Sequence, residues 1–103
     1  MPPTIEIHPA AVAEAKAARE WYAERSAKAA AAFMAEIDLA MAQIQEHPER
    51  WRSHRQGERR YLLKRFPFLV VYRRVDERIQ VLAVAHARRR PGYWRRRKSN
   101  RRR

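Results

Sequence analysis

Cysteine is absent from this sequence of 103 residues, glycine occurs only twice, and no long apolar run is present. Without cysteine, a disulfide framework, a thiolate zinc site and a cysteine nucleophile are excluded. Two glycines cannot form the glycine-rich loop that cradles a nucleotide phosphate, which argues strongly against a kinase or a dehydrogenase. No apolar stretch approaches the roughly 20 residues that cross a bilayer, and residues 1–6 lack the pattern of a secretory signal. We therefore expect a cytoplasmic protein with no membrane partner.

Motifs for metal binding and covalent catalysis are also missing. The four histidines are His8, His47, His54 and His86. Their spacing matches none of the short patterns that ligate a metal. None of the three serines follows the strand-to-helix pattern of a hydrolase nucleophile. We expect neither a metal nor a cofactor.

Basic residues far outnumber acidic ones, and they are concentrated in the second half of the chain. Lysine and arginine total 24 against 11 for aspartate and glutamate, which gives a formal net charge of +13. Residues 1–47 carry a net charge of −3, residues 48–85 of +6, and residues 86–103 of +10. Such an excess predicts an anionic partner: a nucleic acid, an acidic protein or an anionic surface. The length fits one domain, which we place at residues 1–97, followed by a basic, disordered tail at residues 98–103.

The first half of the chain predicts a short strand and two helices. Residues 4–8 alternate apolar and polar side chains, which is the period of a strand. Residues 10–25 are nearly all strong helix formers, with His8 at the cap position and Pro9 in the first turn. A second helix is predicted over residues 26–47, with a serine at its N-cap. Two helices joined by a short connection indicate a helical hairpin.

The second half predicts an antiparallel sheet. Residues 60–64, 66–74 and 78–86 are rich in β-branched and aromatic residues and are separated by turn signals. This pattern is typical of a three-stranded antiparallel meander. Its last two strands are apolar on both faces, so each face needs a cover. The predicted fold class is α+β, with an N-terminal strand, a helical hairpin packed on one sheet face, and the meander.

The segment that follows the last strand, residues 86–95, carries the candidate functional groups. It combines an imidazole, several guanidinium groups and two aromatic rings. His86 can shuttle a proton, and arginines can grip phosphates or stabilise developing negative charge. Tyr93 and Trp94 either stack on a target or fold back to cover the open sheet face, and the sequence leaves both interpretations open.

Five motifs, in chain order, carry a family resemblance: residues 8–11, Trp21 with Tyr22, and residues 47–50, 66–73 and 86–94. Over residues 4–97 the chain resembles the RelE/ParE superfamily of type II toxin–antitoxin toxins, also called plasmid stabilisation proteins. The resemblance implies a toxin that arrests bacterial growth and is neutralised by a cognate antitoxin with an acidic segment. A net charge of +13 suits such an acidic segment.

The superfamily divides by target, and the resemblance leaves two targets open. RelE-like members are metal-independent endoribonucleases that cut messenger RNA on the ribosome, whereas ParE-like members inhibit DNA gyrase. For the nuclease, the resemblance implies four catalytic candidates: Arg60, His86, Arg88 and Tyr93. Leu62 and Leu69 stand where RelE-like nucleases carry a lysine and an arginine, and a leucine cannot stabilise a phosphorane. This departure favours the ParE-like, gyrase-directed function.

The remaining candidate residues are basic or aromatic positions that we expect to contact the target. They are Lys64, Arg73, Arg89, Arg90, Trp94 and Arg95. A third hypothesis is a non-toxic module that binds RNA or the ribosome mainly through its basic C-terminal end.

Overall fold

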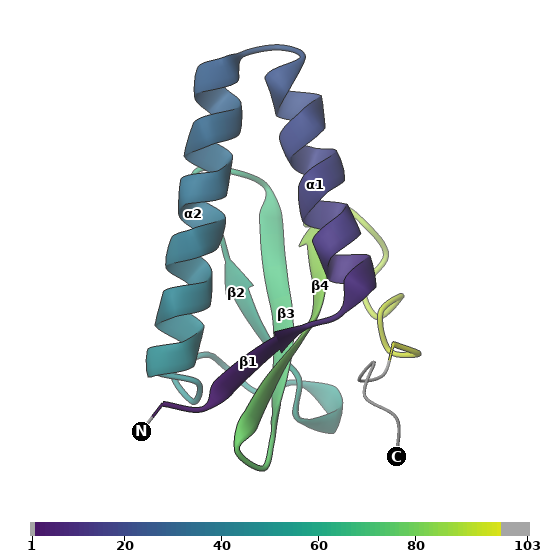
Figure 1. Cartoon of the computed structure of the whole chain (residues 1–103). Coiled ribbons are helices and arrows are strands. Elements are labelled where there is room, and N and C mark those ends of the chain that lie inside the picture. The colour runs from purple at the N-terminus through teal and green to yellow at the C-terminus, as the bar shows by residue number, and fades with distance from the viewer. Residues whose placement is uncertain (1, 98–103) are drawn as a thin grey trace.

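A strand, a helical hairpin and then three further strands make up the fold, as the sequence predicts (Figure 1). The computed structural model describes residues 2–97, so the predicted basic tail at residues 98–103 lies outside the described residues. The elements in chain order are β1 (Thr4–Ile7), α1 (Pro9–Ala23), α2 (Ala27–Glu46), a one-turn 3-10 helix η1 (Arg55–Gly57), β2 (Arg59–Leu62), β3 (Phe68–Val75) and β4 (Arg78–His86). The predicted α+β class is confirmed.

Both helices begin at the residues that the sequence indicates. The Nδ1 of His8 accepts a hydrogen bond from the backbone N–H of Ala10 at 3.0 Å, and Pro9 occupies the first helical position. The Oγ of Ser26 accepts from the N–H of Ala29 at 3.1 Å. These side chains satisfy backbone donors that have no partner within the helix, which fixes where each helix starts.

The sheet has four strands in the order β1-β4-β3-β2. The predicted antiparallel meander of β2, β3 and β4 is confirmed. The N-terminal strand, which the sequence does not place, pairs parallel to β4, with Ile5 opposite Ile79, so the sheet is mixed rather than purely antiparallel. Parallel pairing needs a long crossover, and the helical hairpin with the first two strands of the meander supplies it.

The turn between β2 and β3 is held by the second helix. The carboxylate of Glu36 accepts hydrogen bonds from the backbone N–H groups of Lys64 and Arg65 and from the Nε of Arg65 at 2.9 Å. Residues 63–67 therefore form this connection, and β3 begins at residue 68 rather than at the predicted residue 66.

A bulge in β4 sets which side chains face each side of the sheet. Along β3, the consecutive residues Val71 and Tyr72 pair with residues 83 and 81 of β4, so Leu82 is the extra residue of the bulge. Val81 and Val84 consequently both pack against the helices, whereas residues 82, 83 and 85 pack on the opposite side. We call this opposite side the second face of the sheet.

The two faces of the sheet have separate cores. The larger core lies between the helices and the sheet, where the ring of Phe33 packs against those of Tyr22, Phe66 and Phe68 with centroids 5.3–5.4 Å apart. The smaller core lies on the second face and is completed by Trp94. Within residues 2–97, no helix combines the length and the apolar character that crossing a bilayer requires.

Candidate functional site

The chain after β4 folds across the second face of the sheet, and we call residues 87–97 the strap. Trp94 is only 2% exposed and packs against Val71, Leu82 and neighbouring residues of β4. Gly92, with φ of 90°, makes the turn that brings the strap back, and its missing side chain leaves the space that the guanidinium of Arg95 occupies. The strap therefore supplies the cover that the second face needs, and a buried Trp94 offers no ring for stacking on a target.

One buried carboxylate fastens the middle of the strap. Glu58, just before β2, is 2% exposed. Its oxygens accept from the indole N–H of Trp94 at 3.1 and 3.2 Å, from Arg60 at 3.2 Å and from the Nε of Arg95 at 3.2 Å. The guanidinium of Arg60 also lies 5.3 Å from the Trp94 ring. Two guanidinium groups share this carboxylate, so the cluster keeps a positive charge.

A second carboxylate, Glu14 on α1, fastens the end of the strap. It accepts from the hydroxyl of Tyr93 at 2.7 Å and from both terminal nitrogens of Arg97 at 2.9 and 3.0 Å. Glu14 also accepts from the N–H of Val84 at 2.9 Å, and Arg97 donates to the carbonyl of Leu82 at 3.0 Å. These two side chains satisfy the backbone groups of β4 beyond the end of β1, where the strand would otherwise have a free edge.

The environment of Tyr93 keeps its phenol protonated. Burial, together with the hydrogen bond to Glu14, raises the pKa of Tyr93 to about 12. The guanidinium of Arg89 is stacked on the Tyr93 ring, with its central carbon 4.0 Å from the ring centroid. A phenol in this state is a structural hydrogen-bond donor and a poor general base near neutral pH.

We expect the variant Tyr93→Phe to lose less stability at alkaline pH than the wild type. A tyrosine in the unfolded chain has a pKa of about 10, whereas that of folded Tyr93 is about 12. The neutral phenol therefore stabilises the fold below the unfolded pKa, and this stabilisation is lost as the pH rises through the folded value. Melting temperatures of both proteins across this range measure the effect, with Tyr72, whose pKa is also about 12, as a reference that both retain. The prediction would be contradicted if the wild type showed a tyrosine titration at the ordinary pKa that is missing from Tyr93→Phe.

The four candidate catalytic residues are held by different parts of the fold. Arg60 contacts Glu58, whereas Tyr93 contacts Glu14. His86 is exposed at the end of β4, where its ring meets the edge of Phe68 at 5.1 Å and its Nδ1 accepts from the backbone N–H of Arg88 at 3.1 Å. The side chain of Arg88 is exposed. These contacts bring His86 and Arg88 together but do not join them to Arg60 or Tyr93.

The candidate target-binding residues are also spread over several surfaces. Arg73 donates to the side chain of Gln80 at 3.2 Å, and Lys64 is exposed beside the turn that Glu36 holds. Arg89 and Arg90 are exposed on the strap, while Arg95 and Trp94 are engaged by Glu58 as described above. Leu62, which pairs with Leu69 on the second face, is 61% exposed and presents an apolar side chain to solvent.

The two carboxylates that organise this region, Glu14 and Glu58, are absent from the sequence-based candidates. A signal for Glu58 is present: it is the only acidic residue over residues 50–75, a stretch that contains nine basic residues. An isolated acid among many bases is a candidate for a buried ion pair. Glu14 has no such signal, because it lies on a helix of mixed charge and its partners Tyr93 and Arg97 are 79 and 83 positions away in the sequence.

A positive field surrounds the Glu58 cluster. Partial burial and the nearby charges of Arg60 and Arg52 lower the pKa of His54 from its ordinary value.

Within residues 2–97, no group of histidine and acidic side chains has the arrangement of a metal site.

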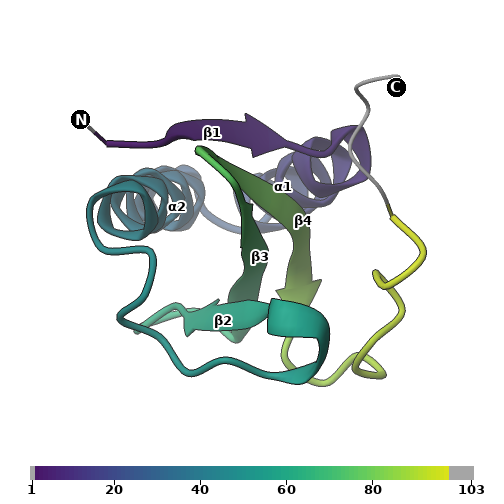
Figure 2. The same cartoon turned by 90° about the horizontal axis from the view of Figure 1, so that it is seen from below.

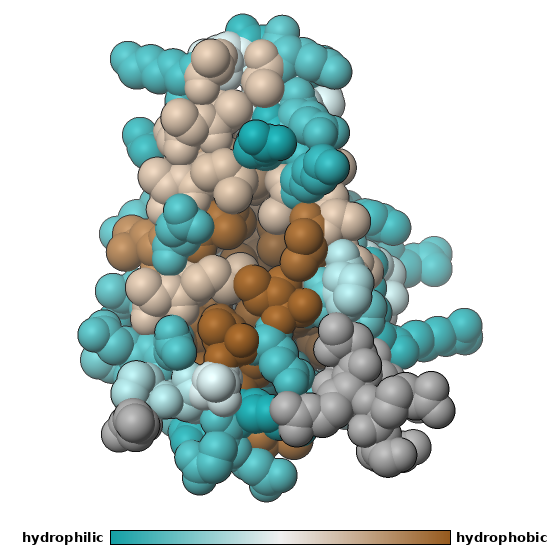
Figure 3. All heavy atoms as spheres, viewed as in Figure 1, coloured by the Kyte–Doolittle hydropathy of each residue, from teal (hydrophilic) through white to brown (hydrophobic). Residues whose placement is uncertain are grey.

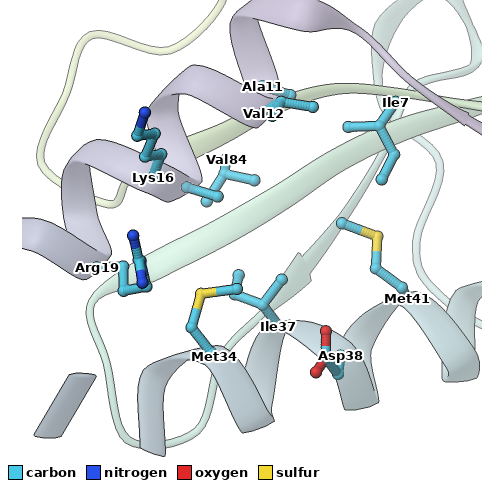
Figure 4. Close-up of a pocket in the computed structure, with 11 residues that line it drawn as sticks. Ile7, Ala11, Val12, Lys16, Arg19, Met34, Ile37, Asp38, Met41 and Val84 are labelled. Atoms are coloured by element: carbon cyan, nitrogen blue, oxygen red, sulfur yellow. The ribbon is translucent and has the colours of Figure 1, made fainter. Parts of the chain in front are cut away.

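A separate apolar groove of about 340 Å³ lies between α1 and α2, on the face opposite the strap. Val12, which is 52% exposed, faces Met34 and Met41 across this groove (Figure 4). Figure 3 shows hydrophobic side chains gathered along the gap between the helices. Lys16 and Arg19 of α1 add positive charge to the groove. Asp38 of α2 adds one negative charge, so the groove combines an apolar floor with a polar rim that is positive on balance.

Comparisons with known proteins point to one family. A family model described as the ParE toxin of the type II toxin–antitoxin system parDE matches residues 5–91. The fold is similar to that of a solved chain from a chromosomal ParDE toxin–antitoxin system of P. aeruginosa, with a TM-score of 0.71 and 22% sequence identity. That similarity covers 82% of this chain and 95% of the solved chain. No curated protein matches the chain.

Proposed function

The chain belongs to the ParE toxin family of type II toxin–antitoxin systems, and on that premise we propose that it arrests bacterial growth in the cytoplasm by inhibiting DNA gyrase, without cutting RNA. The state of the second face carries this proposal. A nuclease of the RelE-like kind needs an open, basic sheet face to receive its substrate, whereas here Trp94 fills that face and Leu62 borders it. A bound RNA would have to displace a buried indole and break its two hydrogen bonds to Glu58.

The chemistry of the candidate catalytic groups supports the same conclusion. Cleavage by general acid–base catalysis requires a base and a phosphate-stabilising group within reach of the same scissile bond. Tyr93 is a neutral phenol bonded to Glu14, and Arg60 is engaged by Glu58. Of the four candidates, only His86 and Arg88 are exposed and adjacent to each other, and they lie outside the Glu58 cluster.

The antitoxin, on this proposal, occupies the groove between α1 and α2. A helical or extended segment with apolar residues on one side would bury the exposed part of Val12 and fill the space beside Met41. Acidic residues on the same segment would pair with Lys16 and Arg19, which form no ion pair within the described part of the chain. An acidic antitoxin therefore fits this groove by shape and by charge.

We expect the purified protein to inhibit DNA supercoiling by gyrase and to leave messenger RNA intact on translating ribosomes. Supercoiling of a relaxed plasmid and toeprinting of a translated message are measured side by side, each with and without the cognate antitoxin. Cut messages with unaffected supercoiling would favour the RelE-like alternative. No effect in either assay, with no growth arrest on expression, would favour the non-toxic RNA-binding module.

The same supercoiling assay tests the groove. Val12→Glu should inhibit gyrase like the wild type, but the antitoxin should no longer reverse the inhibition, because a carboxylate then stands on the apolar floor. Leu39→Glu is the matched control: Leu39 on α2 is 51% exposed, close to the 52% of Val12, and lies outside the groove. Equal reversal of both variants by the antitoxin would place the antitoxin elsewhere.

A further inference from the structure

Two arginine-rich segments lie side by side on the molecule. The chain after β4 runs past η1, and Glu58, the residue after η1, bonds to Trp94 and Arg95 of the strap (Figure 2). The exposed arginines of residues 52–57 and of the strap make no ion pair with any carboxylate of residues 2–97, and we call them together the arginine surface. They are Arg52, Arg55, Arg88, Arg89, Arg90 and Arg96.

Acidic side chains do not offset this charge. Residues 50–57 and 86–97 contain no aspartate or glutamate. The two carboxylates that contact the strap are already paired: the buried Glu58 is shared by Arg60 and Arg95, and Glu14 pairs with Arg97. Uncompensated like charges on one side of a protein repel one another unless an anion lies among them, so the arginine surface is suited to a ligand with several negative charges.

The aromatic rings near the arginine surface are all engaged within the protein. Trp94 is buried, Tyr93 is bonded to Glu14 and stacked with Arg89, and Trp51 packs on Tyr61 with centroids 4.8 Å apart. Proteins that bind single strands rely on free rings on which unpaired bases stack. A duplex has no unpaired bases and presents a dense row of phosphates, which is what exposed guanidinium groups recognise.

We propose that the arginine surface binds the phosphate backbone of duplex DNA, independently of sequence. Guanidinium groups from both segments bind successive phosphates, and Glu58 keeps the two segments in register by holding Arg95 and Trp94 beside η1. This site is distinct from the groove between α1 and α2. DNA can therefore bind while an antitoxin occupies that groove.

The test compares two variants of the full chain with the same net charge. Arg52→Gln, Arg55→Gln and Arg90→Gln together remove three charges from the arginine surface. Lys16→Gln, Arg19→Gln and Lys28→Gln together remove three exposed charges from the helical hairpin, where the described residues also give them no ion pair. Binding to a short mixed-sequence DNA duplex is measured by fluorescence anisotropy over a range of salt concentrations, and thermal unfolding shows that both variants fold.

We expect the first variant to bind the duplex on the order of tenfold more weakly than the wild type. The slope of log affinity against log salt concentration should also become smaller in magnitude by about 3, roughly one for each phosphate that is no longer bound. The second variant should bind close to the wild type. Equal weakening of both variants would mean that net charge alone drives binding and would overturn the proposal. Tighter binding to a single strand of the same length than to the duplex would also overturn the proposal. So would a result in which binding is lost when Lys98, Arg101, Arg102 and Arg103 are neutralised but not when the arginine surface is changed.

This outcome can be separated from that of the proposed target. DNA binding is measured without gyrase, and supercoiling inhibition is measured on the same variants. Duplex binding without inhibition would refute only the gyrase proposal. Inhibition with no duplex binding by the wild type would refute only the role of the arginine surface.

Discussion

Replacing Trp94 with alanine is expected to lower the free energy of unfolding by about 3–5 kcal/mol, the range for truncating a large aromatic side chain in a core. Trp94 is the largest fully buried side chain of the protein's described residues and completes the core of the second face. The variant also removes an indole N–H from a buried carboxylate, Glu58, which is then left with fewer donors. Denaturant unfolding followed by circular dichroism measures the change.

The control for this prediction is Trp21→Ala. Trp21 is 52% exposed, and its ring is stacked with Arg25 at 3.6 Å, so its loss should cost less than about 1 kcal/mol. Trp94→Phe helps to separate the two contributions at the buried site, because it keeps most of the apolar area while it removes the hydrogen-bond donor. Similar losses for Trp94→Ala and Trp21→Ala would show that the strap does not cover the sheet in solution.

The second large effect is expected for Glu58→Ala, with a loss of about 3 kcal/mol, the lower end of the range for removing one partner of a buried ion pair. The side chain of Glu58 is 3% exposed, while those of Arg60 and Arg95 are 23% and 28% exposed. Without the carboxylate, two guanidinium groups face each other with no charge between them, and the N–H of Trp94 has no acceptor. Chemical unfolding at neutral pH gives the difference from the wild type.

Glu49→Ala is the matched control for Glu58→Ala. Glu49 also pairs with two arginines, Arg59 at 3.8 Å and Arg74 at 3.4 Å, but its side chain is 69% exposed. Solvent screens such a pair, so its removal should change the free energy of unfolding by less than about 1 kcal/mol. If both variants lose the same amount, burial of the Glu58 cluster does not determine its contribution.

The sequence predicts the local features of this fold well. Caps such as His8 and Ser26 act within three residues of their own position, so their effect is written in the adjacent sequence. The meander follows from alternating strand-forming stretches and short turns, and the need for a second cover follows from strands that are apolar on both faces. Whether Tyr93 and Trp94 provide that cover stays open in the sequence, and the structure answers it for Trp94.

Features that depend on distant contacts could not be predicted in the same way. The parallel pairing of β1 with β4 joins residues far apart in the sequence, as in the ion pair between Arg78 and Glu6, which are 72 positions apart. The bulge at Leu82 arises from how β3 and β4 pair, and a run of apolar residues does not reveal it. Only the three-dimensional structure shows that Glu14 is the carboxylate that binds the strap, because Glu20 and Glu24, on or beside the same helix, look equivalent in the sequence.

The late position of Trp94 in the chain has a consequence for damaged copies of the gene. Translation adds the helices and all four strands before it reaches the indole that shields Val71 and Leu82. A stop codon anywhere between His86 and Trp94 would therefore yield a polypeptide with a complete sheet whose second face exposes its apolar side chains to solvent. Such a product is prone to aggregation and to degradation by cellular proteases. We therefore expect truncation at this end to eliminate the toxin instead of leaving a partly active fragment.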